Sequence, residues 1–83
     1  MQQTLLIDAS AYASSRELHT ALKRLLSLPD YYGMNADALH DCLSERKEPL
    51  NLWIASEPSG EIARSLAAVC AVVEDLGGTI REI

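Results

Sequence analysis

Two carboxylic acids and a histidine recur at helical spacing near the middle of the chain: Asp37, His40 and Asp41. Residues i, i+3 and i+4 share one side of an α-helix, and Ser44 extends that side by one turn. We call these four residues the acidic face. Carboxylates held on a helix can accept charge-assisted hydrogen bonds from the cations of a binding partner. Spacing alone favours a simpler interpretation, a solvated surface in which Asp37 also stabilises the helix dipole.

Catalytic and metal-binding interpretations of the same segment are weaker. His40-Asp41-Cys42 contains a base and a nucleophile, but on a helix Cys42 points away from His40, and a nucleophile must lie within hydrogen-bond reach of its base. The sequence has no glycine-rich phosphate loop and no paired-Cys or HExxH metal motif. Asp37, His40 and Asp41 lack a fourth ligand for a tightly held metal ion, so a metal-dependent hydrolase is a minor hypothesis. We expect no enzyme activity, no metal and no cofactor.

Local signals place the acidic face on a helix that follows a turn. Pro29 cannot continue a preceding helix, and Gly33 can take a positive φ. Asn35 is a good N-cap, which predicts a helix from about Ala36 to about Glu45. The side of this helix opposite the acidic face is apolar and suited to burial: Ala38, Leu39, Cys42 and Leu43.

The remaining elements are predicted from apolar runs and helix-capping signals. The runs at 3–8 and 50–55 are typical of strands buried on both faces, as in a parallel sheet. A capping box, Ser14-x-x-Glu17, begins a helix that is expected to end near Ser27. Its inward residues are predicted to be Leu18, Leu22, Leu25 and Leu26. The longest helix is expected over 61–76, where Gly77-Gly78 end it, before a last strand over 79–83.

This order of strands and helices indicates an α/β fold. Connections between the strands are long enough for crossovers, so we expect a small three-stranded parallel sheet packed with three or four helices. The 83 residues are expected to form one domain, 1–83, and the hydrophobic fraction of 48% is typical of a globular chain.

The formal net charge of −5 constrains the partner. Phosphates repel an acidic surface, so we expect no binding to nucleic acid, whereas a basic protein would be attracted and steered. No apolar run approaches the roughly 18 residues of a membrane span, and the start lacks the basic region of a signal peptide. Cys42 and Cys70 are predicted to be free thiols on apolar helix sides, which suits the cytoplasm.

The segment Leu28–Leu43 resembles the barstar family of ribonuclease inhibitors. The similarity lies in the run Pro-acidic-Tyr-Tyr-Gly-x-Asn followed by Asp-Ala-Leu-x-Asp-Cys-Leu, and a weaker similarity spans the whole chain. The resemblance implies a barstar-like fold and a cytoplasmic inhibitor of a basic, guanyl-specific, barnase-type microbial ribonuclease. Such an inhibitor blocks the active site one to one, is a monomer when free, and protects the producing cell or gives immunity to a delivered toxin.

The resemblance also implies roles for individual residues. Acids at the positions of Asp37 and Asp41 occupy the nuclease active site in this family, and the one matching Asp41 takes the place of a substrate phosphate. Tyr31 would cover the catalytic pocket, whereas Tyr32 is expected to be structural. The partner-binding set that the resemblance implies is Tyr31, Gly33, Asn35, Ala36, Asp37, His40, Asp41 and Ser44.

Three positions depart from the family pattern. His40 stands where one well-known member of the family has tryptophan, Ala36 where that member has leucine, and Val72 aligns with an outward acid of its last helix. Glu74 and Asp75 are nearby acids, but neither aligns with it. These changes leave open an alternative, a barstar-fold interaction module with a non-nuclease partner. Because histidine commonly titrates between about pH 5 and 8, His40 also suggests that binding varies over this range.

Overall fold

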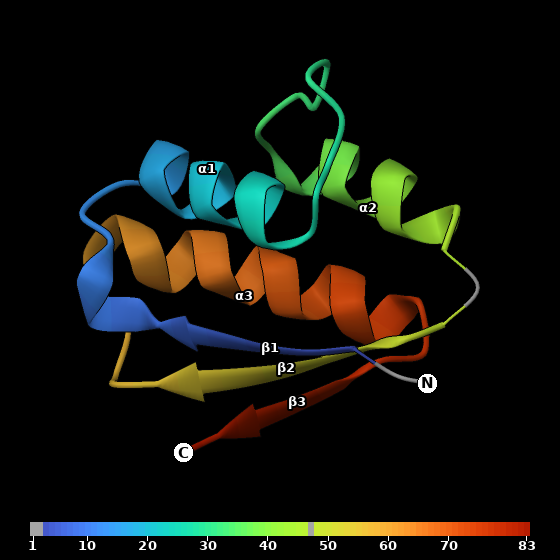
Figure 1. Ribbon diagram of the computed structural model, residues 1–83. Coiled ribbons are helices and arrows are strands. Elements are labelled where there is room, and N and C mark those ends of the chain that lie inside the picture. Colours follow the sequence, from blue (N-terminus) through green and yellow to red (C-terminus); the bar gives the residue numbers. More distant parts are fainter. Residues whose placement is uncertain (1–2, 47) are drawn as a thin grey trace.

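The computed structural model describes residues 3–46 and 48–83. Three parallel strands form one sheet in the order β1-β2-β3: β1 (Gln3–Asp8), β2 (Leu50–Ala55) and β3 (Thr79–Glu82). A 3-10 turn, η1 (Ala9–Ala11), follows β1, and the helices are α1 (Ser15–Leu25), α2 (Ala36–Ser44) and α3 (Gly60–Asp75). In Figure 1 all three helices lie on the same side of the sheet, with α1 and α2 following one another along α3. The predicted α/β fold with a small parallel sheet is confirmed.

The strands are buried on one face only, so the prediction of burial on both faces was wrong. Leu5 and Ile7 of β1 are buried, whereas Leu6 between them is 57% exposed. In β2, Trp53 is 39% exposed and pairs in register with Leu6. The described helices cover only the face that carries Leu5 and Ile7, and strand side chains alternate between faces. A continuous apolar run is therefore no proof that helices cover both sides of a strand.

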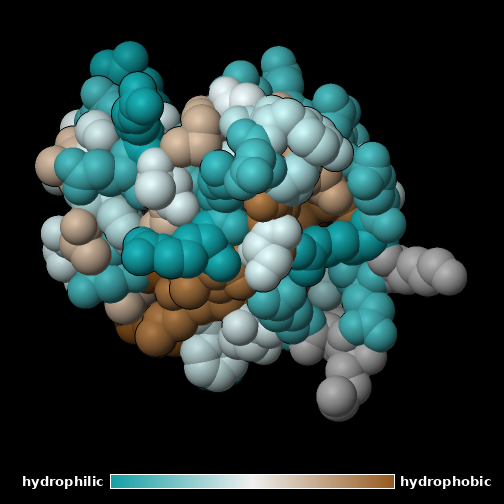
Figure 2. All heavy atoms as spheres, turned by 45° about the horizontal axis from the view of Figure 1, so that its top comes forward, coloured by the Kyte–Doolittle hydropathy of each residue, from teal (hydrophilic) through white to brown (hydrophobic). Residues whose placement is uncertain are grey.

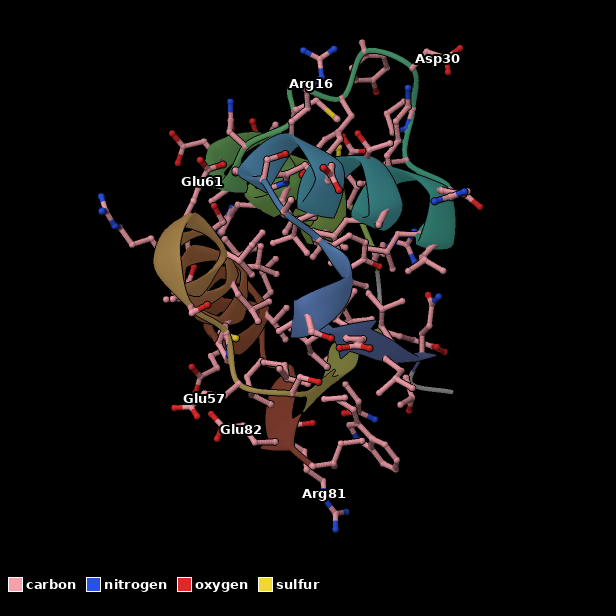
Figure 3. The ribbon with its side chains drawn as sticks, turned by 90° about the vertical axis from the view of Figure 1, so that its left-hand side faces the viewer. Arg16, Asp30, Glu57, Glu61, Arg81 and Glu82 are labelled. Carbon is pink, nitrogen blue, oxygen red and sulfur yellow. The ribbon has the colours of Figure 1, made fainter. Side chains whose placement is uncertain are left out.

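The start of α1 agrees with one half of the predicted capping box, and the return bond to Glu17 comes from Ala13 rather than from Ser14. The Ser14 hydroxyl accepts a hydrogen bond from the Glu17 N–H at 3.2 Å, and the Glu17 carboxylate accepts one from the Ala13 N–H at 3.4 Å. A second tie joins α1 to α3, because the Ser15 N–H donates to the Glu61 carboxylate. Figure 3 shows Glu61 beside the first turn of α1. These bonds fix the start of α1 on the start of α3.

The end of α1 differs from the prediction. The helix stops at Leu25, whose side chain is 45% exposed rather than inward, while Leu26 is buried. Ser27 has a φ of 53°, and the N–H of Leu28 donates to the carbonyl of Lys23 at 2.8 Å. This pattern is a Schellman motif, in which the residue after the C-cap takes a left-handed conformation that glycine adopts most easily. The left-handed turn sends the chain into the loop that precedes α2.

Replacing Ser27 by glycine should therefore stabilise the domain. A left-handed conformation costs an L-residue about 1–2 kcal/mol, and glycine avoids this cost but loses more backbone entropy on folding. We expect Ser27→Gly to raise the free energy of unfolding by roughly 0.5–1 kcal/mol, measured by urea denaturation. Ser65→Gly, inside α3, is the matched control and should lower stability. A loss of stability in Ser27→Gly would contradict this account.

Candidate functional site

The loop between α1 and α2 is held by Asn35, the N-cap of α2. Its side-chain oxygen accepts a hydrogen bond from the Ala38 N–H at 2.8 Å, and its amide nitrogen donates to the Gly33 carbonyl at 3.2 Å. The predicted positive φ at Gly33 was wrong, because Met34 takes the left-handed conformation, with a φ of 60°. Gly33 lies close to α2, because a Cβ there would lie 3.1 Å from the Cβ of Ala38. The loop packs closely against the first turn of α2.

A buried pair of polar rings supports this loop from below. The Tyr32 hydroxyl lies 2.6 Å from Nδ1 of His19 and 3.4 Å from the Asn35 carbonyl, to which it donates. Both rings are buried, which confirms the expectation that Tyr32 is structural. Burial lowers the pKa of His19, and burial with a smaller contribution from Cys42 raises the pKa of Tyr32 to about 12. The pair ties α1 to the N-cap of α2.

Sequence reasoning missed His19. One available signal was its position three residues before the inward Leu22, which puts both on the same side of α1. Its hydrogen-bond partner, the Tyr32 hydroxyl, lies in the loop before α2, and the two residues meet only in the folded chain.

The His19 burial gives a testable pH dependence of stability. Above about pH 6.5 this imidazole is neutral in both states; below it, the unfolded chain takes up a proton that the folded chain resists. The free energy of unfolding should therefore fall as the pH drops from about 6.5 towards the lowered native value. His19→Gln, which keeps a hydrogen-bonding group near Tyr32, should flatten this fall. Urea unfolding on both sides of that pH checks this, and an equally steep fall in the variant would refute it.

The acidic face lies where the helical spacing predicted. Asp37, Asp41 and Ser44 are exposed on α2, and the N-cap at Asn35 fixes the start of the helix beneath them. Figure 2, which brings the helix side of the molecule forward, shows hydrophilic side chains over most of this surface. The Ser44 hydroxyl donates to the Asp41 carbonyl at 2.8 Å, so it is engaged by its own helix. The two carboxylates point to solvent from a fixed helix.

Other residues of the predicted set differ in exposure. Tyr31 is 82% exposed at the loop, beside the buried Tyr32. Asn35 and Gly33 are exposed, but the Asn35 side chain is used by the cap. Ala36 is half-buried against the core and offers little surface. Within the predicted set, the strongly exposed ring is therefore Tyr31 and the exposed acids are Asp37 and Asp41.

Of the two acids noted near the end of the last helix, Asp75 contacts the acidic face. Val72, which aligns with an outward acid of the family, is buried in the core. Asp75, one turn later in α3, reaches α2 instead: its Oδ2 lies 2.8 Å from Nε2 of His40. The half-exposed His40 ring is thus paired across two helices. Among the described residues, no three His, Cys, Asp or Glu side chains are arranged to hold a metal ion.

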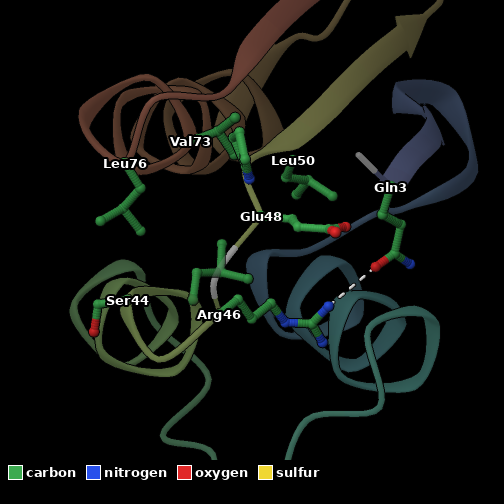
Figure 4. Close-up of a pocket in the computed structure, with 9 residues that line it drawn as sticks. Gln3, Ser44, Arg46, Glu48, Leu50, Val73 and Leu76 are labelled. Atoms are coloured by element: carbon green, nitrogen blue, oxygen red, sulfur yellow. Dashed lines mark hydrogen bonds between the residues drawn. The ribbon is translucent and has the colours of Figure 1, made fainter. Parts of the chain in front are cut away.

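A hollow lies at the other end of α2. Figure 4 shows a pocket of about 490 Å³ with an apolar floor that includes Leu50, Val73 and Leu76. Its polar wall includes Arg46, whose Nη1 donates to the Gln3 side chain at 3.0 Å and whose Nη2 donates to the Leu26 carbonyl. Arg46 therefore joins the end of α2 to β1 and to the end of α1.

Comparison with known proteins decides the family. Residues 2–81 match the sequence profile of the family described as Barstar (barnase inhibitor). This chain belongs to the barstar family. The resemblance drawn from Leu28–Leu43 is thereby confirmed.

One curated relative adds to this. A protein of Bacillus subtilis (strain 168) named "Putative ribonuclease inhibitor YrdF" is 48% identical over 40 residues. Those residues make up 48% of this chain and 44% of the relative, so the match spans less than half of either protein. In the described parts of this barstar-family chain, no helix has the length and apolarity needed to cross a membrane.

Proposed function

We propose that this barstar-family chain inhibits a basic, guanyl-specific, barnase-type microbial ribonuclease by blocking its active site in a one-to-one complex. The observation that carries the proposal is the pair of exposed carboxylates, Asp37 and Asp41, on a capped helix in a member of this family. The net charge of −5 is complementary to an enzyme that binds a polyanion. No catalysis is required of the inhibitor, which has only to occupy the cleft.

Each residue has a physical role in this proposal. A ribonuclease surrounds its phosphate pocket with cations, and Asp41 accepts hydrogen bonds from them in place of the phosphate. Asp37, one turn earlier, makes a second charged contact, and the exposed ring of Tyr31 covers the pocket. Because the cap and the buried Tyr32 already hold this surface in place, little loop ordering opposes binding.

The proposed role also implies the compartment and the oligomeric state of the free chain. The free chain acts as a cytoplasmic monomer that neutralises the nuclease before export, or that gives immunity to a delivered toxin. Two free, half-buried thiols, Cys42 and Cys70, are compatible with a reducing compartment. Burial raises the pKa of the Cys70 thiol, which makes it a poor nucleophile.

A titration of RNA cleavage tests the proposal. Increasing amounts of the chain are added to a fixed concentration of a guanyl-specific ribonuclease, and the initial rate of cleavage is followed. We expect activity to fall linearly and to reach its minimum at one equivalent. Undiminished cleavage at a large excess of the chain would overturn the proposal for this class of enzyme.

A second candidate function is a barstar-fold interaction module with a non-nuclease partner. It is favoured by the centre of the acidic face, where His40 and Ala36 provide less apolar area than the family pattern, and by the burial of Val72. It predicts no inhibition of guanyl-specific ribonucleases together with tight, Asp41-dependent binding to a purified protein of another class.

A further inference from the structure

At the acidic face, the imidazole of His40 contacts a carboxylate from another helix. His40 lies in α2 and Asp75 is the last residue of α3, and their atoms Nε2 and Oδ2 are 2.8 Å apart. The side chain of His40 is 39% exposed and that of Asp75 is 71% exposed. The pair therefore stands at the surface, where a docking partner would meet it.

The contact determines which nitrogen of His40 remains available as an acceptor. A carboxylate can only accept hydrogen bonds, so Nε2 must carry the proton that joins it to Asp75. With that proton on Nε2, a neutral ring has its lone pair on Nδ1. Asp37, one turn earlier, and Asp41, the next residue, are further acids on the same helix.

We propose that Asp75 is a positioning residue that fixes the orientation and tautomer of His40, and that the pair selects a partner with a cationic N–H donor opposite Nδ1. This inference rests on the proposed function and specifies the partner's chemistry at the centre of the interface. An arginine or lysine satisfies both the Nδ1 lone pair and the surrounding carboxylates. A partner with an apolar group at this point leaves Nδ1 buried without a hydrogen bond and is rejected.

The orientation can be tested on the free protein. In ¹⁵N-labelled protein above about pH 7.5, where imidazoles are mostly neutral, two-bond ¹H–¹⁵N spectra identify the protonated nitrogen of His40. We expect the proton to be held on Nε2. Asp75→Asn should mix the tautomers, because an amide can donate as well as accept. Asp75→Glu should restore the wild-type spectrum, and Glu74→Gln, the neighbouring acid, should leave it unchanged.

Binding to a guanyl-specific ribonuclease tests the partner's chemistry. We expect Asp75→Asn to raise Kd about tenfold and Glu74→Gln less than about twofold. In a His40→Ala background, Asp75→Asn should have a clearly smaller effect, since the two residues act as a pair. Equal effects of the Asp75 and Glu74 variants, or additive effects of His40 and Asp75, would overturn the selection of a cationic donor. If the wild-type chain does not bind the ribonuclease, the proposed function is wrong. The spectra of the free protein still test whether Asp75 orients His40.

Discussion

Asp41→Asn is expected to weaken binding to a guanyl-specific ribonuclease by about 10²- to 10³-fold. Removing one partner of a desolvated, hydrogen-bonded charge pair typically costs about 2–5 kcal/mol, because the opposing cations are left buried without their acceptor. The substitution preserves the shape of the side chain and removes only its charge. Asp41 is exposed on α2, so the free energy of unfolding should change little. Affinity is measured by calorimetry or by inhibition of RNA cleavage.

Glu57→Gln is the matched control for this experiment. It removes the same amount of charge from an exposed residue in the turn after β2. Figure 3 shows Glu57 at the sheet end of the molecule, far from Asp30 in the loop before α2. Both variants lose the same amount of net charge, so their difference reports the effect of the Asp41 carboxylate beyond a change in net charge. Equal losses of affinity in the two variants would show that Asp41 makes no specific contact.

Gly78→Ala is expected to be the most damaging small substitution for the fold. A Cβ on Gly78 would lie 2.2 Å from the Leu50 carbonyl oxygen and 2.6 Å from Cγ1 of Val73, so the backbone of α3 or β2 must move. Forcing atoms into a packed region costs about 1–3 kcal/mol or more. For a domain of this size each kcal/mol lowers Tm by about 4–8 °C, so thermal unfolding should show a large decrease.

Gly77→Ala separates crowding from backbone strain. Gly77 has a φ of 86° in the Schellman motif that ends α3, but a Cβ there meets no atom within 4 Å. We expect a loss of only about 1 kcal/mol from the left-handed conformation. A larger loss for Gly77→Ala than for Gly78→Ala would contradict the close approach of β2 to Gly78.

The sequence predicted the parts of the fold that local signals determine. Asn35 begins α2 because its side chain caps the Ala38 N–H, and the Gly77-Gly78 pair ends α3 within one residue of the predicted position. The acidic face was found for the same reason, since Asp37, His40 and Asp41 share one side of any helix that contains them.

The sequence did not predict features that depend on packing between elements. Leu6 and Trp53 look like core residues within their apolar runs, yet the described helices cover only the opposite face of the sheet. Arg81 of β3 instead lies over the Trp53 ring, 5.4 Å from its centroid. The His40–Asp75 contact joins residues far apart in the chain, so it depends on how α2 packs against α3.

We propose that the loop and the acidic face occupy a nuclease active site. Calorimetric titration of the chain into a guanyl-specific ribonuclease, with and without saturating guanosine 3′-phosphate, tests it directly. Active-site occupation predicts one chain bound per enzyme and an apparent Kd that rises by a factor of one plus the ratio of the nucleotide concentration to the nucleotide's own dissociation constant. Binding with the same affinity in the presence of the nucleotide, or no binding at all, would contradict the claim.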